Sequence, residues 1–199
     1  MSRKPETTRR KILEAAFDEF YKNGFQGSSI NRIVDQAGTT KGALFHHFED
    51  KNDLGYAVVE EIVFPCIKER WLNPLADSID PIAALKKVMR QFAKEEAADA
   101  RLAHGCPLNN LAQEMAPLDE GFRRRLEKIY SAWREALEAA LARGIKAGTV
   151  RKGISPRNAA ALVVAALEGI IGTAKNAQSL ELLEQAGEGL FDYLDSLRP

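Results

Sequence analysis

Helical periodicity is the feature of this 199-residue sequence that most restricts its fold. Apolar residues recur every three to four positions in nearly every segment, and no stretch alternates strictly between apolar and polar residues as a half-buried strand would. The first segment shows the pattern with a stripe formed by Ile12, Leu13, Ala16, Phe17, Phe20 and Tyr21. The sequence therefore predicts an all-α protein.

Capping residues divide the first fifty residues into three short helices and the start of a fourth. Gly24 and Gly38 are placed to end the first two helices, because glycine tolerates the left-handed backbone of a helix C-terminus. Side chains that can accept hydrogen bonds from free backbone N–H groups supply the N-caps. The candidate N-caps of the second, third and fourth helices are Ser28 or Ser29, Thr39 or Thr40, and Asp50.

Longer helices are predicted beyond residue 50. The fourth helix is expected to run from Lys51 towards Trp71, and Pro65 should kink or divide it because proline has no N–H to donate. Prolines at first helical positions and capping side chains mark the later helix starts at Pro81, Pro107, Asp119, Pro156 and Ser179. The pattern predicts roughly nine helices, either in one domain or in a small domain fused to a larger one.

Composition sets limits on the class of protein. Hydrophobic residues at 45% and charged residues at 28% are typical of a folded globular protein. We find no apolar run of the roughly 18 residues that span a bilayer, and the first residues, MSRKPETTRRK, lack the apolar core of a signal peptide. We therefore expect a cytoplasmic protein with no membrane partner. Cys66 and Cys106 have no paired spacing, which argues against a disulfide framework or a zinc site.

The formal net charge is zero, which argues against a protein that coats nucleic acid through a general positive field. Basic residues nevertheless cluster at the N-terminus and form a candidate basic arm, consisting of Arg3, Lys4, Arg9, Arg10 and Lys11. A solvated helix face would explain the same run equally well when it is taken alone.

The segment from Ser29 to Phe48 has the layout of a helix-turn-helix, in which the second of two short helices enters the major groove of DNA. Gly38 supplies the turn. Thr39 and Thr40 place hydroxyls at the start of the second helix, where backbone N–H groups also favour phosphate.

The second of these helices carries different residues on its two sides. Lys41 offers a cation in the first turn, and Gly42 and Ala43 are small enough for close approach to base edges. Leu44 and Phe48 are predicted to point the other way and hold the helix against the core.

The run GSSINRIVDQAGTTKGALFHHFEDKNDL resembles the N-terminal signature of TetR-type transcriptional regulators. The resemblance implies a DNA-binding domain at residues 1–50 and an effector-binding and dimerisation domain at residues 51–199. The sequence departs from the signature at Phe45, where tyrosine is usual, and at Ile30, where some members have threonine. The DNA-contacting residues that it implies are Ser29, Asn31, Thr39, Thr40, Lys41, Gly42, Ala43, Phe45, His46, His47 and Lys51.

The resemblance also implies partners for the longer helices. The last two helices of such proteins pair in a homodimer, and Gly169 and Gly172 would let another helix approach closely, although a buried helix within one chain has the same pattern. The middle helices would surround a pocket for a small-molecule effector, and no cofactor is implied. The candidate ligand-binding residues are Phe64, Trp71, Met89, Phe92, Cys106, Met115, Phe122, Tyr130 and Trp133.

Cys106 admits a second interpretation. In His104-Gly105-Cys106-Pro107 the thiol precedes a predicted helix, whose dipole favours thiolate. The segment GCPLNNLAQEM is similar to one found in a branch of the family that includes electrophile- and hypochlorite-responsive regulators, and Lys175 would match the lysine that acts with the cysteine there. Free cysteines are otherwise usually small buried hydrophobes.

Two other classes fit the sequence less well than a repressor that an effector releases from its operator. An enzyme that used Cys106 as nucleophile and His104 as base would lack a third orienting group, and no phosphate loop appears. A scaffold without a DNA role would leave the TTKGALFHHF run unexplained. His46 and His47 point about 100° apart on a helix and form no metal pair. The chain is therefore predicted to be a regulator and not an enzyme.

Overall fold

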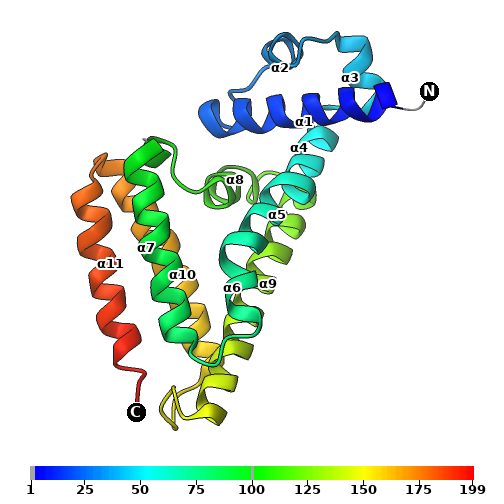
Figure 1. The fold of residues 1–199 in the computed structure, drawn as a ribbon. Helices are drawn as coiled ribbons and strands as arrows, with labels where there is room; N and C mark the ends of the chain where they lie inside the picture. Colours follow the sequence, from blue (N-terminus) through cyan, green and yellow to red (C-terminus); the bar gives the residue numbers. More distant parts are fainter. Residues whose placement is uncertain (1–2, 100) are drawn as a thin grey trace. The chain divides into compact units, whose positions relative to one another are not determined.

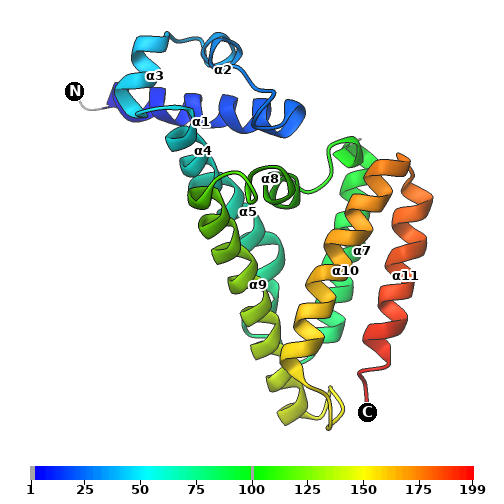
Figure 2. The same ribbon diagram turned by 180° about the vertical axis from the view of Figure 1, so that it is seen from behind.

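The computed structural model describes residues 3–99 and 101–199, and side chains within 7–97 and 102–199 (Figures 1 and 2). All secondary structure in these ranges is helical, with no strand, so the all-α prediction is confirmed. The first four helices are α1 (Arg3–Asn23), α2 (Ile30–Gln36), α3 (Lys41–His47) and α4 (Lys51–Val58).

The structure decides between the alternative caps of these helices. Ser29, Thr40 and Asp50 are the N-caps of α2, α3 and α4, and each accepts a hydrogen bond from a backbone N–H in the first turn of its helix. Gly24 and Gly38 have φ angles of +73° and +61°, as expected for residues that end α1 and α2. The helix starts and ends predicted from local signals in this part of the chain are thus confirmed.

Pro65 lies in a helix with wider turns on either side. After α4 the chain continues through π-helical η1 (Val59–Val63), α5 (Phe64–Ile67), π-helical η2 (Lys68–Leu72) and α6 (Asn73–Ala76). Interruptions of this kind are expected where a proline removes a bond from the helical ladder. If α4 to α6 are counted as one interrupted helix, the part of the chain that the structure describes forms nine helices, as predicted, besides one short 3₁₀ helix.

The later helices begin at the prolines and caps that the sequence indicated. The Asp80 carboxylate accepts from the Ala83 N–H at 2.9 Å, and Ser179 Oγ accepts from the Leu182 N–H at 3.0 Å. These elements are α7 (Pro81–Asp99), the short 3₁₀ helix η3 (Arg101–Ala103), α8 (Pro107–Met115), α9 (Glu120–Ala147), α10 (Pro156–Ala177) and α11 (Leu180–Asp195).

The chain forms two compact units, and each is made of two separate stretches of sequence. Unit 1 consists of Met1–Cys66 with Pro107–Lys128, and unit 2 consists of Ile67–Cys106 with Ile129–Pro199. The first compact unit therefore includes α8 and the start of α9 as well as the first helices. The functional boundary at residue 50 stays a prediction.

The core of unit 1 joins its two stretches of sequence through aromatic rings. The Phe122 ring lies 4.7 Å from that of Phe25 and 4.9 Å from that of Tyr56, in edge-to-face arrangements. Gly55 permits this packing, because a Cβ at that position would lie 2.5 Å from the Phe122 ring. The helices α2 and α3 lie along one side of α1 (Figures 1 and 2), and Ile33 and Leu44 from them are fully buried.

In unit 2, α7, α10 and α11 lie side by side (Figures 1 and 2). The helix α10 has 22 mostly apolar residues, and by length and composition alone it could cross a membrane. The expectation that no run in this sequence reaches such a length was therefore wrong, because Glu168 and Lys175 are too few charges to interrupt it. A core helix packed inside a protein can have the same length and composition, and α10 has several buried residues here, including Val163, Leu167 and Ile171.

Candidate nucleic-acid interface and ligand cavity

The helix α3 presents one side to solvent and the other to the core of unit 1. Leu44 and Phe48 are buried, as predicted. Lys41, Gly42 and His46 are exposed, and Phe45 keeps 49% of its surface exposed, which is unusual for an aromatic side chain. We call the exposed residues Lys41, Gly42, Phe45 and His46 the α3 outer face. This face combines a cation, an imidazole and an aromatic ring on a helix that is fixed from behind.

The other predicted DNA-contacting residues lie around this face in differing degrees of exposure. Asn31 is exposed on α2, whereas Ala43 and His47 are half-buried. The Ser29 and Thr40 hydroxyls act as caps, since they accept from the Asn31 and Ala43 N–H groups at 3.2 Å. Thr39 is half-buried in the turn.

The Lys51 side chain contacts other residues of unit 1. Its ammonium donates to the Ser28 carbonyl at 2.9 Å and lies 4.7 Å from the centre of the Phe25 ring. Burial lowers the pKa of Lys51 from its ordinary value, because a partly desolvated ammonium is less stable than a hydrated one. A phosphate contact from Lys51 stays a prediction.

Part of the candidate basic arm lies on α1 and forms ion pairs with carboxylates of the same chain. The Arg9 guanidinium donates to the Glu61 carboxylate at 2.6 Å and lies 5.2 Å from the Phe48 ring centre. That hydrogen bond raises the pKa of Arg9 and lowers the pKa of Glu61. Arg10 pairs with Glu14 at 2.7 Å. Lys11 is exposed, and the side chains of Arg3 and Lys4 lie outside the described residues.

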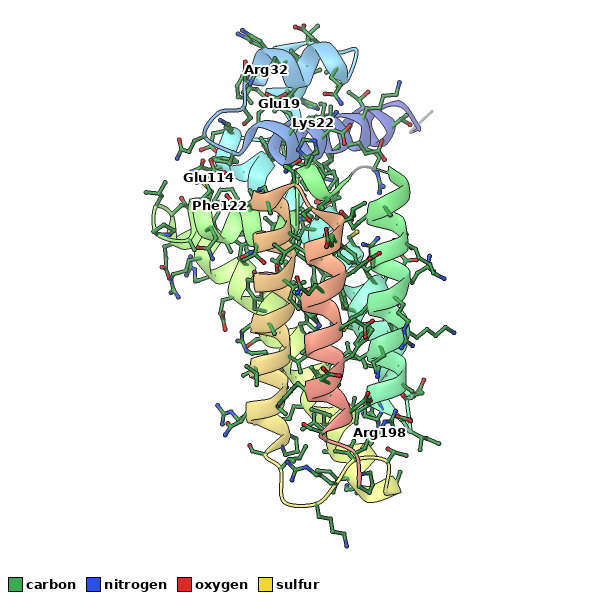
Figure 3. The ribbon with its side chains drawn as sticks, turned by 90° about the vertical axis from the view of Figure 1, so that its left-hand side faces the viewer. Glu19, Lys22, Arg32, Glu114, Phe122 and Arg198 are labelled. Carbon is green, nitrogen blue, oxygen red and sulfur yellow. The ribbon has the colours of Figure 1, made fainter. Side chains whose placement is uncertain are left out.

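Glu19 was not predicted, and it fixes the start of α2 on α1. It is only 5% exposed and accepts from Arg32 Nε at 2.5 Å, Asn23 Nδ2 at 3.0 Å and the Ser29 N–H at 3.3 Å. Figure 3 shows Glu19 and Arg32 in this position. The sequence signal was the place of Glu19 at the edge of the apolar stripe of α1, three residues after Ala16.

Glu114 and Asp119, also not predicted, hold the first helices from the other stretch of unit 1. The Glu114 carboxylate on α8 accepts from the backbone N–H groups of Phe25 and Gln26 at 2.8 and 2.7 Å (Figure 3). Asp119 accepts from the Tyr56 hydroxyl at 2.8 Å, and its bonds to backbone N–H and to Tyr56 lower its pKa. The turn after α1 and the helix α4 are thus both tied to the residues around the start of α9.

Unit 2 contains a cavity of about 430 Å³ between α7, α10 and α11. Of the predicted ligand-binding residues, Trp71, Met89 and Phe92 line this cavity. The remaining six do not line it: Phe64, Met115 and Phe122 belong to unit 1, and Cys106, Tyr130 and Trp133 lie elsewhere in unit 2. Eight of the fifteen residues that line the cavity lie on α10 and α11, and the predicted set included none of these.

Cys106 lies beside a buried carboxylate. Its thiol donates to Glu168 Oε1 over 3.4 Å, and Glu168 is only 7% exposed. The other Glu168 oxygen is buried and has no hydrogen bond to any described residue. Burial raises the pKa of Glu168 to about 7, and the thiol bond offsets this in part. Lys175 packs against Gly105, which has a φ of +70°. The predicted Lys175 therefore lies beside the Gly105–Cys106 segment. Glu168 also contacts Cys106, and the sequence did not indicate this contact.

No group of three or more histidine, cysteine, aspartate or glutamate side chains within the described ranges is arranged to hold a metal ion.

Comparison with known proteins links both parts of the chain to one family. Residues 12–58 match the family described as bacterial regulatory proteins, tetR family, and residues 81–190 match the tetracyclin repressor-like C-terminal domain. A transcriptional regulator of the helix-turn-helix type from the lacX 3' region of Lactococcus lactis is 32% identical over 179 residues, which cover 89% of this chain and 88% of that protein.

Further similarity extends over nearly the full length. The repressor DhaR of Mycobacterium sp. strain GP1 is 27% identical over 98% of this chain and 94% of its own. The crystal structure of a TetR transcriptional regulator from Chloroflexus aurantiacus superposes with a TM-score of 0.84, at 28% identity, over 97% of this chain and 96% of that one. The reduced form of E. coli NemR has the same fold, with a TM-score of 0.83 at 21% identity over 96% of each chain.

Proposed function

Because the chain belongs to the TetR family of bacterial transcriptional regulators, we propose that it represses transcription by placing the α3 outer face in the major groove of an operator. The chain is a DNA-binding regulator of the helix-turn-helix type, and release by a small effector is typical of its family. The observation that carries the proposal is the exposure of Lys41, Phe45 and His46 on a helix whose opposite side is fully buried. The relatives are transcriptional regulators, and we assign no catalytic role.

The α3 outer face suits contacts to both the backbone and the bases of DNA. Lys41 would neutralise a phosphate, and this contact would make binding depend on salt. The exposed ring of Phe45 would touch a thymine methyl group, and His46 would donate to a base edge or a phosphate. Asn31, Gly42 and the half-buried residues of the predicted set would complete the contact area.

Two copies of the chain are needed, since one short recognition helix reads few bases and two must reach successive major grooves about 34 Å apart. The outer sides of α10 and α11 form a shallow apolar groove that would receive the second copy, and we call it the outer groove. Leu162 is 50% exposed there. The groove is lined by Leu162, Ala166, Gly169, Ile170, Thr173, Ala186, Gly189, Leu190 and Tyr193. The dimer would act in the cytoplasm, where the bacterial chromosome lies.

A mobility-shift titration with the DNA upstream of the protein's own gene tests the proposal. Replacing Lys41 by alanine should weaken binding roughly tenfold and reduce the slope of log affinity against log salt by about 1. Lys146→Ala, at an exposed position in the last turn of α9, is the matched control and should bind as the wild type does. Full affinity of Lys41→Ala would contradict this placement of α3.

A second candidate mode of regulation acts through the Cys106 thiol, and the approach of the Lys175 side chain to the preceding Gly105 favours it, because a cation near a thiol supports the reactive thiolate. An electrophile that added to Cys106 would enlarge a side chain packed against a buried carboxylate, directly before α8. Treatment with N-ethylmaleimide should then weaken operator binding of the wild type and of Cys66→Ala, which removes the exposed cysteine. An equal loss of binding in Cys106→Ala would eliminate this candidate.

A further inference from the structure

We propose that the cavity in unit 2 binds an uncharged, largely aromatic small molecule, which enters between α7 and α11. The inference rests on the proposed function, because it identifies the chemical class of the effector and the place where it binds. It is carried by three observations on the described residues: the apolar walls of the cavity, the charges at its mouth, and the contacts that close its two ends.

The walls of the cavity are apolar and partly aromatic. Trp71, Phe92 and Phe191 contribute rings, and Leu167 and Ile171 of α10 contribute aliphatic surface. The Trp71 ring lies 5.9 Å from that of Phe92, so two neighbouring rings form one wall. Rings of this kind prefer offset or edge contacts with a further aromatic ring. A volume of about 430 Å³ is within the range of sites for drug-sized ligands.

The mouth of the cavity carries opposite charges on its two sides. Arg90 and Lys94, one turn apart on α7, line one side, and Glu184 and Glu188, one turn apart on α11, line the other. All four side chains are exposed. Two cations and two carboxylates give the mouth no net charge, so its charges do not favour anions or cations over neutral molecules.

The seam between α7 and α11 is closed on both sides of this mouth. Towards the start of α7, Lys86 donates to Asp195 at 2.6 Å and lies 5.0 Å from the Phe191 ring centre. Towards the end of α7, the buried side chains of Leu102, Ala174 and Leu183 form an apolar cluster. The residues from Arg90 to Lys94 therefore border the open part of the seam.

The interior disfavours a charged ligand. A carboxylate or ammonium group placed among the apolar walls, away from the four charged residues at the mouth, would lose its water without gaining a partner. That loss of hydration costs more free energy than an apolar contact supplies. A neutral aromatic compound loses few favourable interactions with water when it enters, and it gains contact with three aromatic rings.

Ile170 connects the cavity to the surface proposed to contact the second copy of the chain. It lines the cavity and also the outer groove. A ligand that displaces Ile170 would change the surface of α10 that meets the partner in the proposed dimer, and so the distance between the two recognition helices.

Two fluorescent probes of similar aromatic size test the site. N-phenyl-1-naphthylamine is neutral, and 8-anilino-1-naphthalenesulfonate carries a negative charge. The neutral probe should bind the wild type with one site per chain and at least tenfold more tightly than the sulfonate. Tighter binding of the sulfonate would overturn the proposed ligand class.

The variant Gly187→Leu tests the location, because a Cβ at Gly187 meets nothing within 4 Å and the added side chain would extend into the cavity that Gly187 lines. It should bind the neutral probe at least tenfold more weakly. Gln185→Leu, at an exposed position of α11 that lines neither the cavity nor the outer groove, should bind it as the wild type does. Unchanged probe binding by Gly187→Leu would refute the site.

The operator assay separates this inference from the function on which it rests. Without probe, both variants should bind operator DNA as the wild type does, and saturating neutral probe should weaken operator binding of the wild type and Gln185→Leu but not of Gly187→Leu. If the probe binds in the cavity and operator binding does not change, the effector role is refuted and the DNA-binding function stands. If the wild type does not bind operator DNA, the proposed function fails, whatever the probes do.

Discussion

At the scale of single residues, carboxylates in buried or half-buried positions organise both compact units. Glu19 and Glu114 accept backbone N–H groups at the start of α2 and in the turn after α1. Glu168 has a different environment, since one of its oxygens accepts a weak hydrogen bond from the Cys106 thiol and the other is buried without a hydrogen bond to any described residue. Its carboxylate therefore gains less from its partners than it loses by leaving water, which is why its pKa is raised.

Stability should depend on pH through Glu168. Its pKa is about 7 in the folded protein and 4.5 in the absence of such an environment, so the folded state holds the proton more tightly. The stabilising contribution is complete below pH 4.5 and is lost as the pH rises through about 7. Relative to Glu168→Gln, whose neutral amide does not titrate, the wild type should lose about 2 kcal/mol of unfolding free energy between pH about 5 and about 8.

Urea unfolding of both proteins at the two pH values measures this difference. All other titrating groups are shared, so the comparison isolates Glu168. A difference in unfolding free energy that does not change with pH would show that Glu168 has an ordinary pKa.

At the scale of elements, local signals predicted the helices well, whereas the contacts between them could not be predicted. Gly38 and Thr40 act on their own neighbours, so the turn and cap of the helix-turn-helix were evident from the sequence. Phe122 was expected beside the effector but packs against Phe25 in unit 1. Periodicity places an apolar residue on the buried side of a helix, but it does not identify the helix on the other side of the contact.

The helix α8 should stabilise the turn after α1 through Glu114. Replacing Glu114 by alanine leaves the Phe25 and Gln26 N–H groups without their acceptor, and should lower the free energy of unfolding by about 1 kcal/mol. Amide hydrogen exchange at these two residues should become faster. Gln113→Ala, at the exposed neighbouring position of α8, is the control. Unchanged exchange in Glu114→Ala would mean that the carboxylate does not hold this turn.

The contact between α4 and α9 requires a glycine at position 55. A Cβ there would lie 2.5 Å from Phe122 Cζ and 2.7 Å from Phe25 Cε2, so Gly55→Ala should destabilise the protein by about 1–3 kcal/mol in urea unfolding. Gly187→Ala has open space and should be neutral or stabilising by up to about 1 kcal/mol, because alanine favours the helix. Equal stability of the two variants would contradict the close packing at Gly55.

At the scale of the whole molecule, the outer groove was predictable only in outline. The last two helices were expected to pair with a second copy because of the family resemblance, and the exposure of Leu162 agrees with that expectation. The cavity was not foreseen in its observed place, because its walls combine Trp71 with residues about a hundred positions later in the sequence, such as Leu167 and Phe191. The residue pattern within a single helix does not show which residues of other helices will line the same cavity.

A charge in the outer groove should separate the proposed dimer. Leu162→Asp would place a carboxylate where two apolar surfaces meet, so the apparent mass in gel filtration should fall to that of the 22.0 kDa chain. Operator affinity should fall by a factor of roughly ten or more, because the two recognition helices would no longer bind together. Asn176→Asp, exposed on α10 outside the groove, should stay dimeric. A dimeric Leu162→Asp protein would place the interface elsewhere.

The discontinuity of unit 1 bears on how such regulators can be recombined. An exchange of the first 66 residues between two relatives would separate Phe25 and Tyr56 from Phe122, and the turn after α1 from Glu114. A chimera that also carries residues 107–128 from the same parent keeps these contacts together. We therefore expect an exchange of the proposed DNA-binding helices between relatives to need both segments of unit 1 from the same parent.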